Sequence, residues 1–175
     1  YRVQVQGPDQ VTVYISPGKD GRANREAYFE RGEPCPMVVS VGHPPDLFIG
    51  TQERLPSHVN ELAYVGGRRG EAVEVIEGEA TGLPIPAHSE LVLEGHVYPD
   101  AEPVTEGPYG EWTGYYAGGE HEVRPLEVER IYHRDDPIIL GAQLVRPPSQ
   151  VRSEVKTAAR LWSELEEAGI PGIQA

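Results

Sequence analysis

The chain of 175 residues holds a single cysteine, Cys35. A lone cysteine excludes an internal disulfide, and without cysteine partners it cannot build a zinc cluster. Because Cys35 stands between two prolines, we interpret it as a small apolar residue and not as a nucleophile. A reducing, cytoplasmic location is therefore expected.

Long apolar runs are also absent. No stretch of the length that spans a bilayer, about 18 apolar residues, occurs, so a membrane-spanning helix is excluded. The first residues form no basic segment followed by an apolar one, and we expect no signal peptide. The start at Tyr1, without methionine, suggests a fragment of a longer protein.

Basic residues are few. Fifteen Lys and Arg face 28 Asp and Glu, which gives a formal net charge of -13. Such a chain repels phosphate backbones, so nucleic-acid binding is not expected. A bound anionic cofactor would need local compensation from arginines, backbone amides or a divalent metal.

Glycine and proline are abundant, with 20 and 17 residues, and nine of the thirteen aromatic residues are tyrosine. This composition favours one turn-rich β domain over a helical bundle. Alternating or continuous apolar residues predict strands, and a mainly β, antiparallel barrel, in these segments: a hairpin over 1–16, then 36–42, 72–77, 90–98, 121–133 and 138–140.

Few helices are predicted. Residues 24–31 read as a short helix or loop, and a short helix follows Pro45. Another begins at Asn60 or Ser57 and stops at Gly66-Gly67. A last helix over about 150–168 carries an apolar stripe that needs a covering surface. The domains predicted are a barrel over 1–148 and a C-terminal linker helix over 149–175.

The stretch 106–116 concentrates unusual residues: two carboxylates, three glycines, a proline and three tyrosines. Proline and glycine fix a shaped loop, on which Glu106 and Glu111 are presented. Two interpretations stay open from this segment alone. It is either a loop that carries acid/base residues or a surface turn with solvated glutamates.

Three ordered motifs resemble the UbiD family of reversible decarboxylases that use prenylated flavin mononucleotide. Residues 83–95 resemble its P-A-x-x-E-I-V-L-E-G strand, and residues 106–111 its E-G-P-[FY]-G-E loop, followed by T-G-Y-Y. Residues 61–70 resemble E-x-x-x-A-G-x-x-R-G, although Gly66 stands where alanine is usual. Motifs in this order and spacing are specific where one alone is not.

The resemblance implies a split β-barrel, flavin-reductase-like, that binds the flavin. It also implies a carboxy-lyase acting on an aromatic or α,β-unsaturated carboxylic acid. In that scheme Arg2 binds the substrate carboxylate beside the flavin, Glu106 pairs with Arg2, and Glu111 delivers the proton. Without the resemblance, Arg2 would read as an exposed arginine at the end of a strand.

The family's metal site maps onto Glu61 and Asp20, with manganese as the expected ion and potassium as a second candidate. Asp20 replaces the usual histidine, and an asparagine ligand would precede residue 1. The alternatives are a helix-start carboxylate for Glu61 and a plain turn aspartate for Asp20. Four strand glutamates are assigned no chemistry and are expected on a solvated face: Glu74, Glu77, Glu90 and Glu94.

The expected partners are a small carboxylic acid substrate, other domains or subunits, and further copies of the protein. A rival hypothesis is a module that binds flavin, or only assembles domains, without turnover. For this chain alone we expect folding but no catalysis, because the family closes its site with a neighbouring domain.

Overall fold

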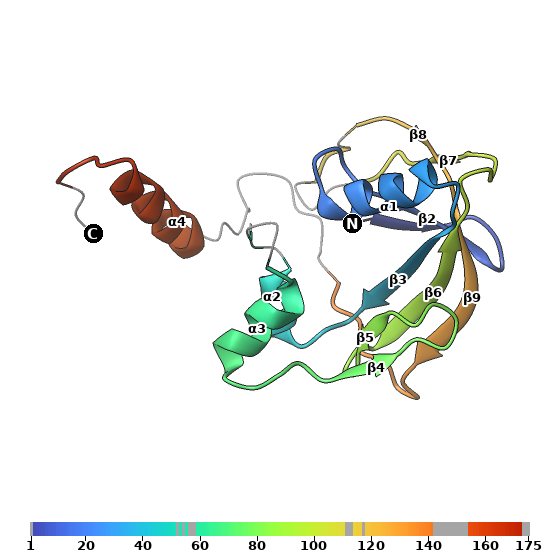
Figure 1. Ribbon diagram of the computed structural model, residues 1–175, viewed down its shortest axis with the longest axis horizontal. Coiled ribbons are helices and arrows are strands. Elements are labelled where there is room, and N and C mark those ends of the chain that lie inside the picture. Colours follow the sequence, from blue (N-terminus) through green and yellow to red (C-terminus); the bar gives the residue numbers. More distant parts are fainter. Residues whose placement is uncertain are drawn as a thin grey trace. The chain divides into compact units, whose positions relative to one another are not determined.

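A computed structural model describes residues 2–51, 53, 55, 59–110, 114–116, 118–141 and 154–172. The chain divides into two compact units (Figure 1). The first comprises Tyr1–Tyr109 and Gly118–Gly141, and the second Gly110–Ala117 and Ala142–Ala175. Each unit is described by itself. The predicted border at 148/149 stays a prediction.

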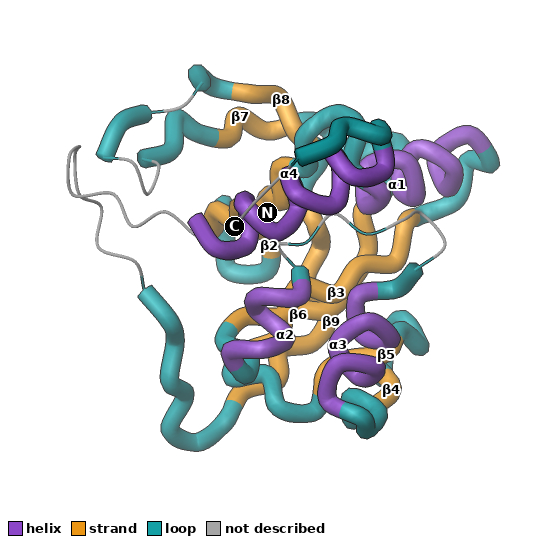
Figure 2. The backbone as a smooth tube through the Cα atoms, turned by 90° about the vertical axis from the view of Figure 1, so that its left-hand side faces the viewer, coloured by secondary structure: helices purple, strands orange, loops and turns teal. Residues whose placement is uncertain are grey.

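The first unit is built on a curled, five-stranded antiparallel sheet with the strand order β1-β2-β9-β6-β3. Figure 2 shows β3, β6 and β9 running side by side. The predicted N-terminal hairpin is confirmed as β1 and β2, which pair in register. The strands are β1 (Arg2–Val5), β2 (Gln10–Tyr14), β3 (Cys35–Val41), β6 (Leu91–Val97) and β9 (Leu126–His133).

Alternation along β2 builds the core, as the apolar period of two predicts. Val11, Val13 and Ile15 are buried together with Val97 and Leu126. Cys35 is also buried, and burial raises the pKa of its thiol. This agrees with an apolar, unreactive cysteine.

A register shift between Glu94 and Gly95 bends the pairing of β6 with β9. A Cβ atom at Gly95 would lie 1.8 Å from the carbonyl oxygen of Glu127. Glycine is therefore required there by the close approach of the two backbones.

Two small hairpins accompany the main sheet. β4 (Val75–Glu77) pairs with β5 (Pro84–Pro86), and β7 (Val104–Glu106) pairs with β8 (His121–Val123). The strand predicted over 72–77 is thus shorter, and β5 was not expected because both its ends are proline. The strand predicted over 138–140 is wrong: these residues form no described strand and their side chains are at least half exposed.

Helices α1 (Asp20–Glu30), α2 (Pro45–Gly50) and α3 (Glu61–Arg69) belong to the first unit. α1 begins earlier than predicted, so Asp20 is its first residue and not part of a turn. Asn60 caps α3 as predicted, with its Oδ1 accepting from the amides of Leu62 and Ala63. The predicted stop at Gly66-Gly67 is wrong, because the helix continues to Arg69 and Gly70 supplies the left-handed cap with φ 77°.

An ion pair joins α2 to α3. Arg69 Nη2 donates to Asp46 Oδ1 at 2.7 Å, and Arg69 Nε also pairs with this carboxylate. The hydrogen bonds from Arg69 lower the pKa of Asp46 to about 2. Among the described helices, none is long and apolar enough to cross a bilayer.

The second unit contains α4 (Glu154–Glu167), where a helix was predicted. Its Leu161 is 47% exposed, and Trp162 Nε1 donates to Glu166 Oε1 at 2.6 Å. The described strands and short helices confirm the predicted fold class, a mainly β fold with few short helices and one helix near the C-terminus.

Candidate active site

Glu106 is the centre of the candidate site. It ends β7 and is fully buried, with 0% exposure. Its Oε1 accepts from the backbone amide of Tyr14 at 3.2 Å and from the hydroxyl of Tyr109 at 2.9 Å. Its Oε2 has no hydrogen-bond partner among the residues that the structure describes. A buried carboxylate oxygen without a partner is costly, so this atom is suited to a group that binds there.

The guanidinium of Arg2 lies against two aromatic rings. Its carbon Cζ is 5.1 Å from the ring centroid of Tyr109 and 5.4 Å from that of Tyr14. These distances are in the range of cation–π attraction, within about 6 Å. The ring of Tyr14 also stacks on His121, with centroids 4.5 Å apart and planes 18° apart. Arg2 and Glu106 thus share Tyr109 and Tyr14 as neighbours.

The loop after Glu106 is tied to β1. The amide of Gly107 donates to Gln4 Oε1 at 2.9 Å, and Gln6 Nε2 donates to the carbonyl oxygen of Thr105 at 3.2 Å. Gly107 has φ 96°, and a Cβ there would come within 3.0 Å of the Gly119 carbonyl oxygen. The turn at Gly107 therefore requires glycine, and Gln4 of β1 and Gln6, just after β1, bind the backbone on the two sides of Glu106.

Tyr109 has a strongly perturbed hydroxyl. Burial, and then the hydrogen bond to Glu106 and its charge, raise the pKa of Tyr109 to about 12. The Thr12 hydroxyl and the charge of Arg2 act in the opposite direction and are outweighed. The hydroxyl consequently remains a proton-bearing donor throughout the physiological range.

The remaining predicted residues do not join this cluster among the described atoms. Glu111 lies outside the described residues. Asp20 and Glu61 are each exposed and each begins a helix, α1 and α3. Across the described ranges, no group of three or more His, Cys, Asp or Glu side chains is placed to hold a metal ion. Their carboxylates have the right chemistry for manganese, but further ligands would have to come from elsewhere.

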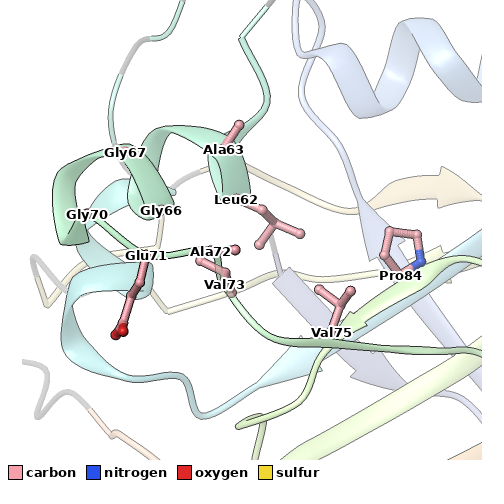
Figure 3. A pocket seen from close by; sticks show the side chains of 10 residues that line it. All are labelled: Leu62, Ala63, Gly66, Gly67, Gly70, Glu71, Ala72, Val73, Val75 and Pro84. Carbon is pink, nitrogen blue, oxygen red and sulfur yellow. The ribbon is translucent and has the colours of Figure 1, made fainter.

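The helix that begins with Glu61 borders an open pocket (Figure 3). Small residues of α3 face the segment before β4 across it, and Leu62, Val73, Val75 and Pro84 give it an apolar lining. Its lining holds one carboxylate, Glu71, and no acid/base pair. None of the residues around Glu106, which are Arg2, Gln4, Tyr14, Tyr109 and His121 (the Glu106 cluster), lines this pocket.

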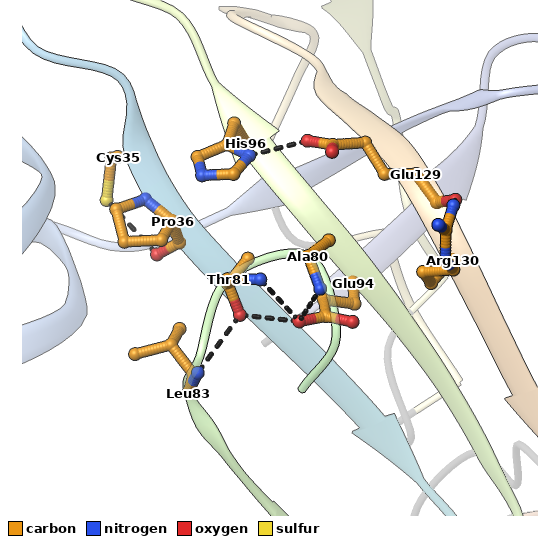
Figure 4. Close-up of polar contacts among 9 residues, drawn as sticks. All are labelled: Cys35, Pro36, Ala80, Thr81, Leu83, Glu94, His96, Glu129 and Arg130. Carbon is orange, nitrogen blue, oxygen red and sulfur yellow. Dashed lines mark hydrogen bonds and ion pairs between the residues drawn. The ribbon is translucent and has the colours of Figure 1, made fainter. Parts of the chain in front are cut away.

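Glu94 corrects the prediction of a solvated glutamate face. It is fully buried, and Figure 4 shows the turn at residues 80–81 folded over it. Its Oε1 accepts from the amides of Ala80 (3.1 Å) and Thr81 (2.7 Å) and from the Thr81 hydroxyl (2.7 Å). Its Oε2 accepts from the Tyr132 hydroxyl at 2.6 Å. Burial raises the pKa of Glu94, but these hydrogen bonds outweigh it and the net pKa is lowered.

Glu74 and Glu77 are exposed, as predicted. Glu90 is half-buried and accepts from the amide of Ile138 at 3.1 Å. Two residues further along β6, His96 Nδ1 contacts Glu129 Oε1 at 2.5 Å (Figure 4). Of the four glutamates predicted on the solvated face, Glu94 is the one that is fully buried.

Sequence reasoning missed Tyr14, Gln4 and His121 as members of the Glu106 cluster. Tyr14 is the last residue of an alternating strand, and nothing in its local pattern distinguishes it from a strand-end tyrosine. The pairing of β7 with β8 puts His121 opposite Glu106, and that pairing joins residues 15 apart in the sequence, which periodicity does not fix.

Residues 1–147 match the family model described as UbiD, 3-octaprenyl-4-hydroxybenzoate carboxy-lyase Rift-related domain. Since this match covers most of the chain, the chain belongs to the UbiD family. The resemblance of the three motifs is thereby confirmed.

Solved structures of UbiD-class enzymes share the fold. One is HmfF from Pelotomaculum thermopropionicum in complex with FMN, 27% identical with a TM-score of 0.71 over 78% of this chain. Another is the vanillic acid decarboxylase of Sedimentibacter hydroxybenzoicus in its open form, 30% identical with a TM-score of 0.70 over 84%. A third is the apo 3,4-dihydroxybenzoic acid decarboxylase of Klebsiella pneumoniae, 27% identical with a TM-score of 0.77 over 97%.

This chain spans about a third of each of those proteins: 30% of the first, 31% of the second and 36% of the third. The comparisons therefore define the fold of this chain and the family that it belongs to, over about a third of the length of these relatives.

Proposed function

We propose that this chain is the central, flavin-binding part of a decarboxylase that acts on an aromatic or α,β-unsaturated carboxylic acid. Structures of one UbiD-class relative are described in complex with FMN and with prenylated FMN. Prenylated FMN is accordingly the cofactor proposed here, with manganese, and potassium as a second candidate ion. When bound, the flavin supplies the electron sink that loss of CO2 from an sp2 carbon needs.

Arg2 has the proposed task of binding the substrate carboxylate. A guanidinium is a planar donor that matches a carboxylate in two parallel hydrogen bonds. The rings of Tyr109 and Tyr14 limit where the guanidinium lies. Arg2 thereby orients the substrate, so that the bond to be broken is presented in one geometry.

Glu106 has the proposed task of a fixed negative partner for Arg2. Its burial keeps water from this carboxylate, which strengthens its attraction to a nearby cation. Glu111 has the proposed task of proton donor, because the carbon that loses CO2 must gain a proton. Glu111 lies outside the described residues, so its role rests on the family motif alone.

The observation that carries the proposal is the buried Glu106 carboxylate, with Oε2 unpartnered among the described atoms, in a cluster with Arg2. A surface turn with solvated glutamates, the alternative kept open above, would leave this side chain in water. Instead, Glu106 is buried, and it contacts the same two tyrosines that lie against Arg2. A buried acidic side chain close to a cation is typical of a functional site.

The test is reconstitution of the complete protein with prenylated FMN and manganese. A panel of aromatic and cinnamic acids is then supplied and CO2 release is measured. Multiple turnovers with at least one acid are expected. If the protein binds the flavin and releases no CO2 from any acid, the catalytic proposal is wrong.

A second candidate function is a module that holds flavin without turnover. It is favoured by the incomplete set of metal ligands, since Asp20 and Glu61 are exposed and no described group of three ligands surrounds them. The absorption spectrum of the reconstituted protein separates binding from catalysis, because a flavin that binds and is never turned over still colours the protein. For this chain by itself we propose no turnover, because it covers only about a third of its relatives.

A further inference from the structure

The Glu106 carboxylate and the Arg2 guanidinium share a third residue, Tyr109, whose side chain contacts both. The hydroxyl of Tyr109 donates to Glu106 Oε1 at 2.9 Å. Its ring lies 5.1 Å from the Arg2 guanidinium carbon. Tyr109 therefore contacts Glu106 through its hydroxyl and Arg2 through the face of its ring.

The hydrogen bonds at Glu106 are unevenly distributed over its two oxygens. A carboxylate oxygen has two lone pairs. Oε1 accepts two hydrogen bonds, from the Tyr109 hydroxyl and the Tyr14 amide, whereas Oε2 accepts none from the described residues. Oε1 is thus saturated, and Oε2 is the oxygen that is open to another donor.

The direction of the Tyr109 hydrogen bond is fixed. Because burial and Glu106 raise the pKa of Tyr109 to about 12, its hydroxyl keeps its proton and donates. Rotation of the Glu106 carboxylate would bring Oε2 to these two donors and leave Oε1 open, which gives the same arrangement. What the donors fix is one saturated and one open oxygen.

We propose that Tyr109 is a positioning residue that sets this arrangement and, with Tyr14, clamps the Arg2 guanidinium. The inference rests on the proposed function for its kinetic consequences. Its structural half, the clamp on Arg2, stands on the two cation–π distances alone. Tyr109 acts through Glu106 and Arg2 and touches no reacting atom in this scheme.

The two parts of the side chain can be separated by substitution. Tyr109→Phe removes the hydroxyl and keeps the ring, so Glu106 Oε1 loses one of its two donors while the clamp on Arg2 stays. Tyr109→Leu removes both. If Tyr109 positions both groups, Tyr109→Phe disturbs the position of the Glu106 carboxylate alone. Tyr109→Leu also weakens the binding of the substrate carboxylate by Arg2.

A matched control exists in the same unit. Tyr132 also donates its hydroxyl to a fully buried glutamate, Glu94, at 2.6 Å. Tyr132→Phe therefore removes a hydrogen bond of the same kind outside the candidate site. It should lower thermal stability as Tyr109→Phe does, and leave kcat within about twofold of the parent.

The kinetic experiment uses the complete, reconstituted protein. For Tyr109→Phe we expect kcat to fall about tenfold with KM nearly unchanged, the size of one lost hydrogen bond to a charged group. For Tyr109→Leu we expect an additional rise in KM of about tenfold. The proposal would be overturned if kcat fell equally in Tyr109→Phe and Tyr132→Phe. It would also be overturned if KM stayed constant in Tyr109→Leu.

A second readout does not depend on turnover. The Nε–H signal of Arg2 in an NMR spectrum is shifted by the ring currents of its two aromatic neighbours. We expect this shift to persist in Tyr109→Phe and to decrease in Tyr109→Leu. An Arg2 signal that is the same in the parent and in Tyr109→Leu contradicts the clamp. If the parent releases no CO2 but the Arg2 signal still changes in Tyr109→Leu, the proposed function is refuted and the position of Arg2 between the two rings is not.

Discussion

Tyr132 donates a 2.6 Å hydrogen bond to Oε2 of the fully buried Glu94 and so joins β9 to β6 through their side chains. The hydroxyl of Tyr132 also accepts from the amide of Glu79 at 3.0 Å. Together with the three hydrogen bonds at Oε1, this contact holds the 78–83 turn on the sheet. Glu94 thus has a structural task, while Glu106, buried to the same extent, has one oxygen that accepts no hydrogen bond from the described residues.

Glu94→Gln should destabilise the protein strongly. The amide of glutamine replaces one acceptor by a donor, which would face either the Tyr132 hydroxyl or the amides of the turn. The loss of charge-assisted hydrogen bonds of this kind costs about 2 to 3 kcal/mol. Urea unfolding measures it, with Glu74→Gln as the exposed control, and a loss below about 0.5 kcal/mol would contradict the account.

The stability should also depend on pH through Glu94. Its pKa is lowered in the folded state from the usual 4.5, so the unfolded chain binds the proton more readily. The stabilisation is complete above the unfolded pKa and is lost as the pH falls through the lower folded value. Urea midpoints from pH 6 down to pH 3 should fall more steeply for the parent than for Glu94→Gln. If the urea midpoints of the parent and of Glu94→Gln fell in parallel with pH, Glu94 would not be the cause of the loss of stability in acid.

Gly95→Ala tests the register shift between β6 and β9, where Gly95 faces the extra residue of β9. The added Cβ would lie 1.8 Å from a backbone oxygen of β9, and backbone atoms cannot move aside as a flexible side chain can. We expect a loss of at least about 2 kcal/mol in the free energy of unfolding. Gly67→Ala is the matched control, because its Cβ meets nothing within 4 Å and alanine favours the helix by about 0.5 to 1 kcal/mol. Similar losses of stability in the two variants would refute the close approach of the β6 and β9 backbones at Gly95.

Glu61→Ala separates the two interpretations of that carboxylate. If Glu61 is a metal ligand, flavin affinity should fall about tenfold with manganese present and stay constant without it. Glu71→Ala is the control, because Glu71 is also exposed and lies just beyond the other end of α3. Titrations that give equal affinities for parent and variant in both conditions would leave Glu61 as a helix-start carboxylate that interacts with the dipole.

Much of the fold could be predicted from the sequence because the physical causes are local. Val11, Val13 and Ile15 alternate, and Asn60 has the side chain that caps a helix, and both features are found. The helix stop at Gly66-Gly67 was wrong because glycine is tolerated inside a helix that packs well, and Gly66 is buried there.

The inward position of Glu94 could not be predicted, because alternation assigns a residue to a face of the sheet and does not say what covers that face. The covering turn comes from residues 78–83, about fourteen positions earlier. The candidate site had the same limit. Its motif gave Glu106, but the contacts of Tyr109 and Tyr14 with Arg2 depend on how β1, β2 and β7 meet in space.

The most direct test of the account compares two buried glutamates in the complete, prenylated-FMN-loaded protein. Glu106→Gln should keep the fold and the bound flavin but lower the rate of CO2 release at least about a hundredfold, because it removes the negative charge proposed as the partner of Arg2. Glu94→Gln, measured at low temperature where it remains folded, should retain a rate within about threefold of the parent. A Glu106→Gln protein that decarboxylates as fast as Glu94→Gln would contradict the assignment of the Glu106 cluster as the active site.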